Sequence, residues 1–449
     1  YGKEGEPVGD PVSDVIVENI GNNGSTYDDG TDTFIRGKNP NNYVWYSGKL
    51  WRAVSINNEA KTTKLVTQWN ISTIYYNSSG SPNFAGSYIE DWLNDESVDG
   101  FLGNLREPEK FIETNAQWDA TMSSSPDLGN IKKPDGTTIV EDAVGLLNMY
   151  EYRYSSYGEV DIENCYLNNG LYWWTLTPDS SSGMWCVSNH GAADSGQTPS
   201  KAYGVRPSIN LKSSVKIVDG SGTIDNPYRL NGDNDSNLSG TLLNTRYSGE
   251  YIRFGNDENN LYRIVSHENG SGTKITSAEP LKNSSTFITS AFDSNSSVNY
   301  SSSTTIGAFL NEEYLTSYVD SEYKDMIEDS TTWYLGTVGY DVSYKLAKYT
   351  DTSMTSTTTS TTSAKVGLLR LGELMSGQFD RFGNNTDYWI LTPYNGSFVR
   401  RVLSYGNTSD YNYPTGVGGV RPSINLKSNV VITGGEGTKN NPFIITLKN

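Results

Sequence analysis

The residues best suited to recognise a ligand lie in a segment that occurs twice in the chain, at the same length but with different side chains. The first occurrence carries Trp185, Asn189, His190 and Asp194, and the second carries Arg400, Arg401, Tyr405, Asp410, Tyr411 and Tyr413. Exposed tyrosine, tryptophan and arginine side chains dominate the binding energy of protein surfaces. The segment therefore predicts a ligand-binding surface, and an ordinary variable surface loop is the alternative that the sequence leaves open.

The two cysteines of the chain, Cys165 and Cys186, offer a second kind of chemistry. Cys165 precedes a predicted strand over residues 173–177, and Cys186 lies in the predicted strand that follows it. Neighbouring strands can bring two sulfurs within bonding range, and an exported protein meets oxidising conditions. We therefore expect a disulfide, with two free thiols or a metal or redox role as the alternatives.

The sequence contains few residues that could support other catalytic or metal-binding chemistry. His190 and His267 are the only histidines, too few for a zinc site with three histidine ligands, and no glycine-rich phosphate loop occurs. Acidic residues of predicted loops, namely Asp179, Asp194 and Asp410, could bind calcium, although solvated loop charge is the simpler interpretation. We expect a non-enzymatic protein without a cofactor, calcium being the one alternative.

The composition narrows the class of partner. The formal net charge is −18 at pH 7, which argues against nucleic acid and anionic lipid. Charged residues are only 19% of the chain, and no apolar run is long enough to cross a bilayer. A polar surface built from Asn, Ser, Thr, Gly and Tyr is typical of exported bacterial proteins. Because the sequence begins at Tyr1, we expect a processed or excised soluble fragment.

A long internal repeat organises the chain into two copies of one domain. The run 204–213, Gly-Val-Arg-Pro-Ser-Ile-Asn-Leu-Lys-Ser, returns unchanged at 419–428, a shift of 215 residues. Trp174 and Pro178 return at the same shift as Trp389 and Pro393. The repeat predicts a lead segment over 1–30, a first domain over 31–230, a linker over 231–237 and a second domain over 238–449.

Each copy shows strands at its ends and helices in its middle, which predicts the α+β class. Ile89, Trp92 and Leu93 share one face of a predicted helix that begins at Ser87, and the second copy repeats this pattern from Thr304. Residues 205–211 predict a single strand, in which Arg206 would bond to backbone carbonyls, with anion binding as the alternative. The Ser- and Thr-rich segment 350–365 predicts a flexible surface loop.

The repeated motifs resemble a bacterial domain of uncharacterised function. Its usual form is Tyr-Trp-Leu-Arg-Ser-Pro followed some thirty residues later by Gly-Val-Arg-Pro-Ala, and here 174–178 and 204–211 match it. That family is similar in outline to the C-type-lectin-like fold that formylglycine-generating enzymes share. The resemblance implies two tandem C-type-lectin-like domains, with the segment between the motifs facing a ligand.

The functional residues of those relatives do not carry over. The calcium-binding triplets of C-type lectins are absent, since 92–95 reads Trp-Leu-Asn-Asp with an inserted leucine. Formylglycine-generating oxidases need two close cysteines in their closing motif, and Cys165 and Cys186 lie elsewhere. That oxidase activity is therefore the remotest of the alternatives.

These observations together predict an extracellular protein of a Gram-positive-type bacterial cell surface. We expect a binding module of the adhesin type, with a glycan or a host or bacterial surface protein as its partner. The main alternative is a structural subunit that self-assembles into a surface filament or layer.

Overall fold

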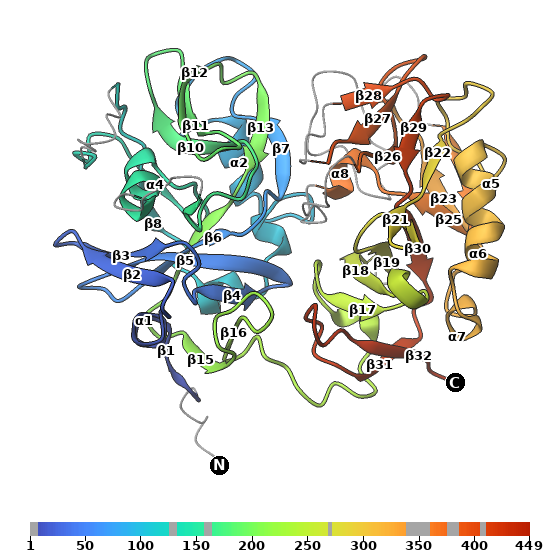
Figure 1. The fold of residues 1–449 in the computed structure, drawn as a ribbon, viewed down its shortest axis with the longest axis horizontal. Coiled ribbons are helices and arrows are strands. Elements are labelled where there is room, and N and C mark those ends of the chain that lie inside the picture. The colour runs from blue at the N-terminus through green and yellow to red at the C-terminus, as the bar shows by residue number, and fades with distance from the viewer. Residues whose placement is uncertain are drawn as a thin grey trace. The chain divides into compact units, whose positions relative to one another are not determined.

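The computed structural model describes residues 8–124, 133–156, 164–267, 272–337, 360–374, 386–404 and 410–449. The chain divides into two compact units, Tyr1–Asn234 (unit 1) and Asp235–Asn449 (unit 2). Both units consist mainly of strands with a few short helices, so the α+β class is confirmed (Figure 1). No helix in the described ranges is long and apolar enough to cross a membrane.

The elements of unit 1 are β1 (Asp10–Pro11), α1 (Val12–Glu18), β2 (Gly24–Asp28), β3 (Asp32–Gly37), β4 (Tyr43–Tyr46), β5 (Lys49–Asn57), β6 (Thr63–Thr67), β7 (Ser72–Tyr75), α2 (Tyr88–Asn94), η1 (Leu102–Asn104), α3 (Pro108–Phe111), β8 (Ala116–Asp119), β9 (Ile139–Asp142), α4 (Met149–Ser156), β10 (Trp173–Pro178), β11 (Met184–Val187), β12 (Ala193–Gln197), β13 (Ala202–Val205), β14 (Ser208–Leu211), β15 (Lys216–Asp219) and β16 (Tyr228–Leu230).

The elements of unit 2 are η3 (Leu243–Thr245), β17 (Tyr251–Arg253), η4 (Asp257–Asn259), β18 (Leu261–Ser266), β19 (Thr273–Ser277), β20 (Lys282–Asn283), β21 (Thr286–Phe287), β22 (Thr289–Ala291), α5 (Thr305–Asn311), α6 (Glu313–Ser317), α7 (Ser321–Lys324), β23 (Thr331–Tyr334), β24 (Thr361–Ala364), β25 (Val366–Leu368), α8 (Leu371–Leu374), β26 (Tyr388–Pro393), β27 (Val399–Val402), β28 (Asp410–Asn412), β29 (Val417–Gly419), β30 (Pro422–Leu426), β31 (Val430–Gly434) and β32 (Ile444–Leu447).

The two units pair their strands in the same order. One sheet of unit 1 runs β12-β11-β10-β13-β7, and one sheet of unit 2 runs β28-β27-β26-β29-β22. In each sheet the central strand carries the repeated tryptophan. Trp174 and Trp389 are fully buried, and their indole Nε1 atoms donate to the carbonyl oxygens of Ile74 and Ser290. The two tryptophans of the repeat therefore occupy equivalent, buried positions in the two units.

The other large sheet contains more strands in unit 1 than in unit 2. Its path is β1-β15-β16-β4-β5-β3-β2, and β6 joins β14 to β5. In unit 2 the corresponding strands run β17-β18-β19-β30-β25, while β31 and β32 form a separate pair. The β2–β3 hairpin is thus an addition of unit 1. The expected boundary at residue 30 falls within the turn of this hairpin, and Val12 and Ile16 of α1 are buried.

The strand predicted over residues 205–211 is wrong, because the chain forms two strands there. β13 pairs with β7 and β10 in one sheet, whereas β14 pairs with β6 in the other. Pro207 has no backbone N–H to continue the first ladder. Arg206 fills the break and donates from Nε to the carbonyl oxygen of Thr67 at 2.9 Å, which confirms its expected bonding to backbone carbonyls.

The helices begin where the sequence predicts. Ser87 accepts a hydrogen bond from the N–H of Glu90 at the start of α2, and Thr304 accepts one from Gly307 at the start of α5. These bonds satisfy backbone donors that a helix start leaves unpaired. The predicted loop 350–365 lies largely outside the described residues, but its end is not a loop, because β24 pairs with β23 there.

A buried ion pair recurs in both units beneath a tryptophan. Lys64 lies 2.5 Å from the Glu151 carboxylate in unit 1, and Lys274 lies 2.6 Å from that of Glu373 in unit 2. The ammonium groups approach the rings of Trp118 and Trp333, at 4.7 and 4.8 Å from the ring centroids. The second pair is the more deeply buried, with side-chain exposures of 2% and 0% against 15% and 10%.

The chain that opens each unit covers the edge of a strand. In unit 1, Asp10 and Pro11 pair with Ile217 and Lys216 of β15. In unit 2, the N–H of Gly240 donates to Ile432 of β31, and Leu242 bridges Val431. Each unit therefore carries its own cover for this edge, which would otherwise expose unpaired backbone groups.

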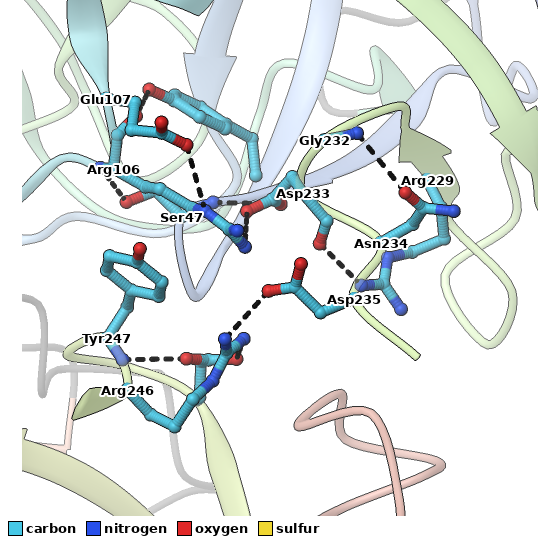
Figure 2. Close-up of polar contacts among 12 residues, drawn as sticks. Ser47, Arg106, Glu107, Arg229, Gly232, Asp233, Asn234, Asp235, Arg246 and Tyr247 are labelled. Carbon is cyan, nitrogen blue, oxygen red and sulfur yellow. Dashed lines mark hydrogen bonds and ion pairs between the residues drawn. The ribbon is translucent and has the colours of Figure 1, made fainter. Parts of the chain in front are cut away.

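Charged residues fix the chain at the point where unit 1 ends and unit 2 begins (Figure 2). Within unit 1, Asp233 pairs with Arg106 at 3.3 Å and accepts a bond from the N–H of Ser47. Within unit 2, Asp235 pairs with Arg246 at 2.7 Å, and Arg246 also pairs with Glu250 at 2.8 Å. The expected linker 231–237 is thus tied down on each side of Asn234.

Candidate functional site

A tight turn between β26 and β27 presents two aromatic side chains on the same stretch of backbone. The N–H of Tyr394 donates to the carbonyl oxygen of Phe398 at 2.9 Å, which closes the turn. Asn395 accepts bonds through Oδ1 from the N–H groups of Ser397 and Phe398, at 2.8 and 3.0 Å. Asparagine is favoured at such turns because its side chain bonds to the backbone a few residues on.

Tyr394 and Phe398 meet Tyr411 of β28 and Tyr413, which follows that strand, and we call these four residues the aromatic cluster. The rings of Tyr394 and Tyr411 stack with centroids 4.0 Å apart and an interplanar angle of 10°. Phe398 lies 5.0 Å from Tyr411 and 4.6 Å from Tyr413 between ring centroids. The cluster nevertheless reaches solvent, since Tyr411 is 42% and Tyr413 58% exposed.

The cluster rests on a buried arginine. Arg400 of β27 is 1% exposed, and its guanidinium carbon lies 5.1 Å from the ring centroid of Tyr394. Arg400 and Tyr411 are cross-strand partners, so both side chains lie on the same face of the sheet. The order from inside to outside is therefore arginine, tyrosine, tyrosine, and the cation under the inner ring favours a fixed ring position.

The next residue along the strand faces the other way. Arg401 donates from Nε and Nη2 to Oδ2 of Asp410, at 3.0 and 2.8 Å, and from Nη1 to the carbonyl oxygen of Val417 at 3.1 Å. Because side chains alternate along a strand, this ion pair lies on the face opposite Arg400 and Tyr411. The carboxylate of Asp410 is thus engaged by the guanidinium and is a poor candidate for a calcium ligand.

The corresponding end of unit 1 keeps the turn and loses the rings. Asp179 donates from its N–H to the carbonyl oxygen of Gly183 at 3.0 Å, as Tyr394 does to Phe398. Asp179, Gly183 and Gly196 stand 215 residues before Tyr394, Phe398 and Tyr411. The Asp179 carboxylate accepts a bond from the N–H of Gly196, and a Cβ on Gly183 would lie 2.4 Å from Asp179 Oδ1.

The candidate residues of unit 1 do not form one surface. Trp185 is 5% exposed and donates from Nε1 to the carbonyl oxygen of Ser123 at 2.7 Å, so the prediction that it faces a ligand is wrong. Asn189 and His190 are exposed in the turn after β11. Asp194 is half-buried on β12, opposite Cys186. Trp185 stands 215 residues before Arg400, so the same position in the strand buries both side chains.

The candidate residues of unit 2 divide between two faces. The structure brings together Arg400, Tyr411 and Tyr413, but Arg400 is buried and supports the rings from beneath instead of facing a ligand. Arg401 and Asp410 pair on the other face, and Tyr405 lies outside the described residues. The sequence analysis missed Tyr394 and Phe398. Comparison of the copies at the 215-residue shift would have found them, because aromatic residues there replace Asp and Gly.

The predicted disulfide between Cys165 and Cys186 is wrong: both are buried thiols. Cys186 lies opposite Trp174 on the strand pair β10–β11, and burial raises the pKa of its thiol well above the usual value. Cys165 lies beside a different set of groups: burial, and then the charge of Cys165, raises the pKa of Tyr152 and Tyr166. The two sulfurs thus lie in separate surroundings.

The described ranges contain no group of three or more His, Cys, Asp or Glu side chains that could hold a metal ion. Asp179 bonds to the backbone of Gly196 and Asp410 to Arg401. The acidic residues that the sequence offered for calcium are therefore dispersed over both units.

Comparison with known proteins gives one match. The model of a family described as "Domain of unknown function (DUF6273)" matches residues 61–213, which run from just before β6 to just after β14 of unit 1. The matched range includes the β10–β11 turn of unit 1 and does not reach the aromatic cluster of unit 2. No curated protein and no solved structure matches the chain.

Proposed function

We propose that the protein is a non-catalytic binding protein and that the aromatic cluster of unit 2 is its ligand-binding surface. The observation that carries this proposal is the exposure of Tyr411 and Tyr413, two rings that are packed against other rings and yet remain in contact with solvent. Leaving large apolar rings in water forgoes the free energy of burying them. Grouped exposed aromatic side chains mark interaction sites more often than isolated ones.

The cluster is also organised before any ligand arrives. Tyr411 is held by its stack on Tyr394, and the turn that carries Tyr394 is fixed by Asn395. Tyrosine loses little side-chain entropy on binding because it has few rotatable bonds. A surface whose rings are already in place avoids part of the ordering cost of association.

The wider proposal is an exported bacterial surface protein of the adhesin type, which binds a glycan or a protein. Its support is the polar, tyrosine-rich composition together with the strong negative charge. We propose in the same way that both units are C-type-lectin-like domains. Their shared strand order and the place of the cluster, between the two repeated motifs, agree with that assignment.

A panel of immobilised glycans and surface proteins, probed with the purified chain, tests the proposal. We expect at least one ligand whose binding is lost in the double variant Tyr411→Ala with Tyr413→Ala. Tyr27→Ala is the matched control, because Tyr27 is 50% exposed in unit 1 and lies outside the cluster. If the double variant still binds every ligand that the unchanged chain binds, the aromatic cluster is not the binding site.

A second function, a structural subunit of a surface filament or layer, is favoured by the edge strand β2. β2 pairs with β3 alone within the described ranges, and four of its five residues are exposed. An unpaired strand edge can accept a strand from another chain. Light scattering over a dilution series distinguishes the two functions, since a filament subunit assembles as the concentration rises and an adhesin stays monomeric.

A further inference from the structure

The stretch of chain that carries the aromatic cluster holds few charged residues, in a chain whose net charge is −18. Only three of the 33 residues from Tyr388 to Val420 are charged: Arg400, Arg401 and Asp410. Arg400 is buried beneath Tyr394. On the opposite face of the sheet Arg401 pairs with Asp410 at 2.8 Å, and it also lies 3.8 Å from the carboxylate of Asp387, which precedes this stretch. A charged ligand would find no exposed, unengaged counter-charge among these residues.

The cluster does offer uncharged hydrogen-bonding groups. The hydroxyls of Tyr394, Tyr411 and Tyr413 have no hydrogen-bond partner in the part of the chain that the structure describes. Asn395 uses Oδ1 for the turn and is exposed, so its Nδ2 adds an uncharged donor in the turn that carries Tyr394. A phenol hydroxyl both donates and accepts, whereas the amide nitrogen donates only. Ring faces and such groups together suit a ligand with apolar C–H faces and many hydroxyls.

The size of the cluster also limits its partner. With Tyr411 at 42% and Tyr413 at 58% exposure, the aromatic area open to solvent is on the order of 200 Å². A stable protein–protein interface buries about 800 Å² on each partner. The cluster is therefore better matched to one or two sugar units than to the face of a folded protein.

We propose that the ligand of this surface is an uncharged glycan, bound through pyranose rings stacked on Tyr411 and Tyr413, without calcium. The inference rests on the proposed function, since it names the ligand class of the same site. Asn395 and the tyrosine hydroxyls bond to the sugar hydroxyls. Binding is insensitive to salt, because no charge pairing contributes to it.

The experiment compares neutral with charged polysaccharides on the intact chain. The probes are mannan, laminarin and N-acetylglucosamine oligomers as neutral sugars, polygalacturonate and heparin as anionic ones, and chitosan oligomers as cationic ones. We expect a neutral probe to bind equally well at low and high salt and in the presence of a chelator. Tyr411→Ala should weaken binding about tenfold or more, as for an interface residue that dominates the binding energy. Tyr27→Ala should leave it unchanged, and circular dichroism verifies that each variant is folded.

The outcomes separate this inference from the proposed function. Salt-sensitive preference for a charged probe, lost in Tyr411→Ala, overturns the uncharged ligand and keeps the binding site. Calcium-dependent binding overturns the inference in the same way. Loss of a protein ligand, and of no glycan, in the tyrosine variants assigns the surface to a protein partner and overturns the inference alone. Binding of a neutral probe that Tyr411→Ala and Tyr413→Ala leave intact overturns both.

Discussion

The turns that follow β10 in unit 1 and β26 in unit 2 close in the same way. Their surface side chains differ at almost every position. Both turns close with the same hydrogen bond, Asp179 to Gly183 and Tyr394 to Phe398. In unit 1 the carboxylate of Asp179 bonds to Gly196, whereas in unit 2 Tyr411 stacks on Tyr394 and packs at a tilt against Phe398. The buried tryptophans beneath are equivalent. The buried strands, which we call the frame, therefore accept different surface side chains around this turn, which we call the outer layer, and one copy can differ from the other there.

The buried tryptophans test whether the frame is equally important in both units. Truncation of Trp174 or Trp389 to Ala should each lower the free energy of unfolding by about 3–5 kcal/mol, because a large core ring leaves a cavity. Chemical denaturation followed by hydrogen exchange assigns each loss to its unit. A loss in one unit only would show that the two frames are not held together in the same way.

The recurrent ion pairs test whether the charged interactions of the frame contribute equally to the stability of the two units. Lys274→Met should cost about 3 kcal/mol in unit 2, because the carboxylate of Glu373 is left buried without its partner. Lys64→Met should cost less in unit 1, because Glu151 retains 10% exposure and contact with water. Urea denaturation of both variants measures the difference. Equal losses, or a larger loss for Lys64→Met, would contradict the conclusion that deeper burial makes the loss larger.

The outer layer should contribute little to stability, in contrast to the frame. Tyr411→Gly gives unit 2 the residue that unit 1 has at this position and removes the stack on Tyr394. We expect a loss of about 1 kcal/mol, the usual contribution of one aromatic pair. Thermal unfolding measures it, with Tyr413→Gly as the companion variant. A loss as large as that of Trp389→Ala would make the cluster part of the core.

Unit 1 has a carboxylate that unit 2 lacks at the corresponding place, so the stability of unit 1 should depend on pH in a way that the stability of unit 2 does not. Burial, and then the charge of Glu90, raises the pKa of Asp142 from 3.8 to about 7, whereas unit 2 has Ala364 at this place. The folded state then binds a proton more tightly than the unfolded state. This contribution is fully present below pH 3.8 and is lost as the pH rises through about 7.

Unit 1 should therefore lose stability between these pH values, and Asp142→Asn should remove that part of the slope. Hydrogen exchange at β8 and β9 over a pH series, corrected for intrinsic exchange, measures it, with β23 and β24 of unit 2 as the internal control. The same slope in both hairpins would contradict the assignment to Asp142.

The sequence predicted the frame better than the site, for physical reasons. The starts of α2 and α5 depend on local bonds of Ser87 and Thr304, which neighbouring residues determine. The burial of Arg400 depends on its place opposite Tyr411, which no local pattern contains. Composition alone made Arg400 an exposed candidate and did not single out Tyr394 and Phe398.

The disulfide failed for a related reason. Closeness of Cys165 and Cys186 in sequence, around one strand, does not fix the side of that strand on which each sulfur packs. That side is set by how the strands pair in the fold, which places Cys186 opposite Trp174. The split at Pro207 was hidden in the same way, because either half of residues 205–211 has a pattern suited to one continuous strand.

The strand cover that opens each unit decides where the chain can be cut. A fragment of unit 2 that begins after Leu242 would lack Gly240 and Leu242, and β31 would show a bare edge to other molecules. Such a fragment would tend to precipitate even though every residue of its sheets is present. A usable recombinant half of this protein therefore has to include residues that the repeat in the sequence assigns to no strand.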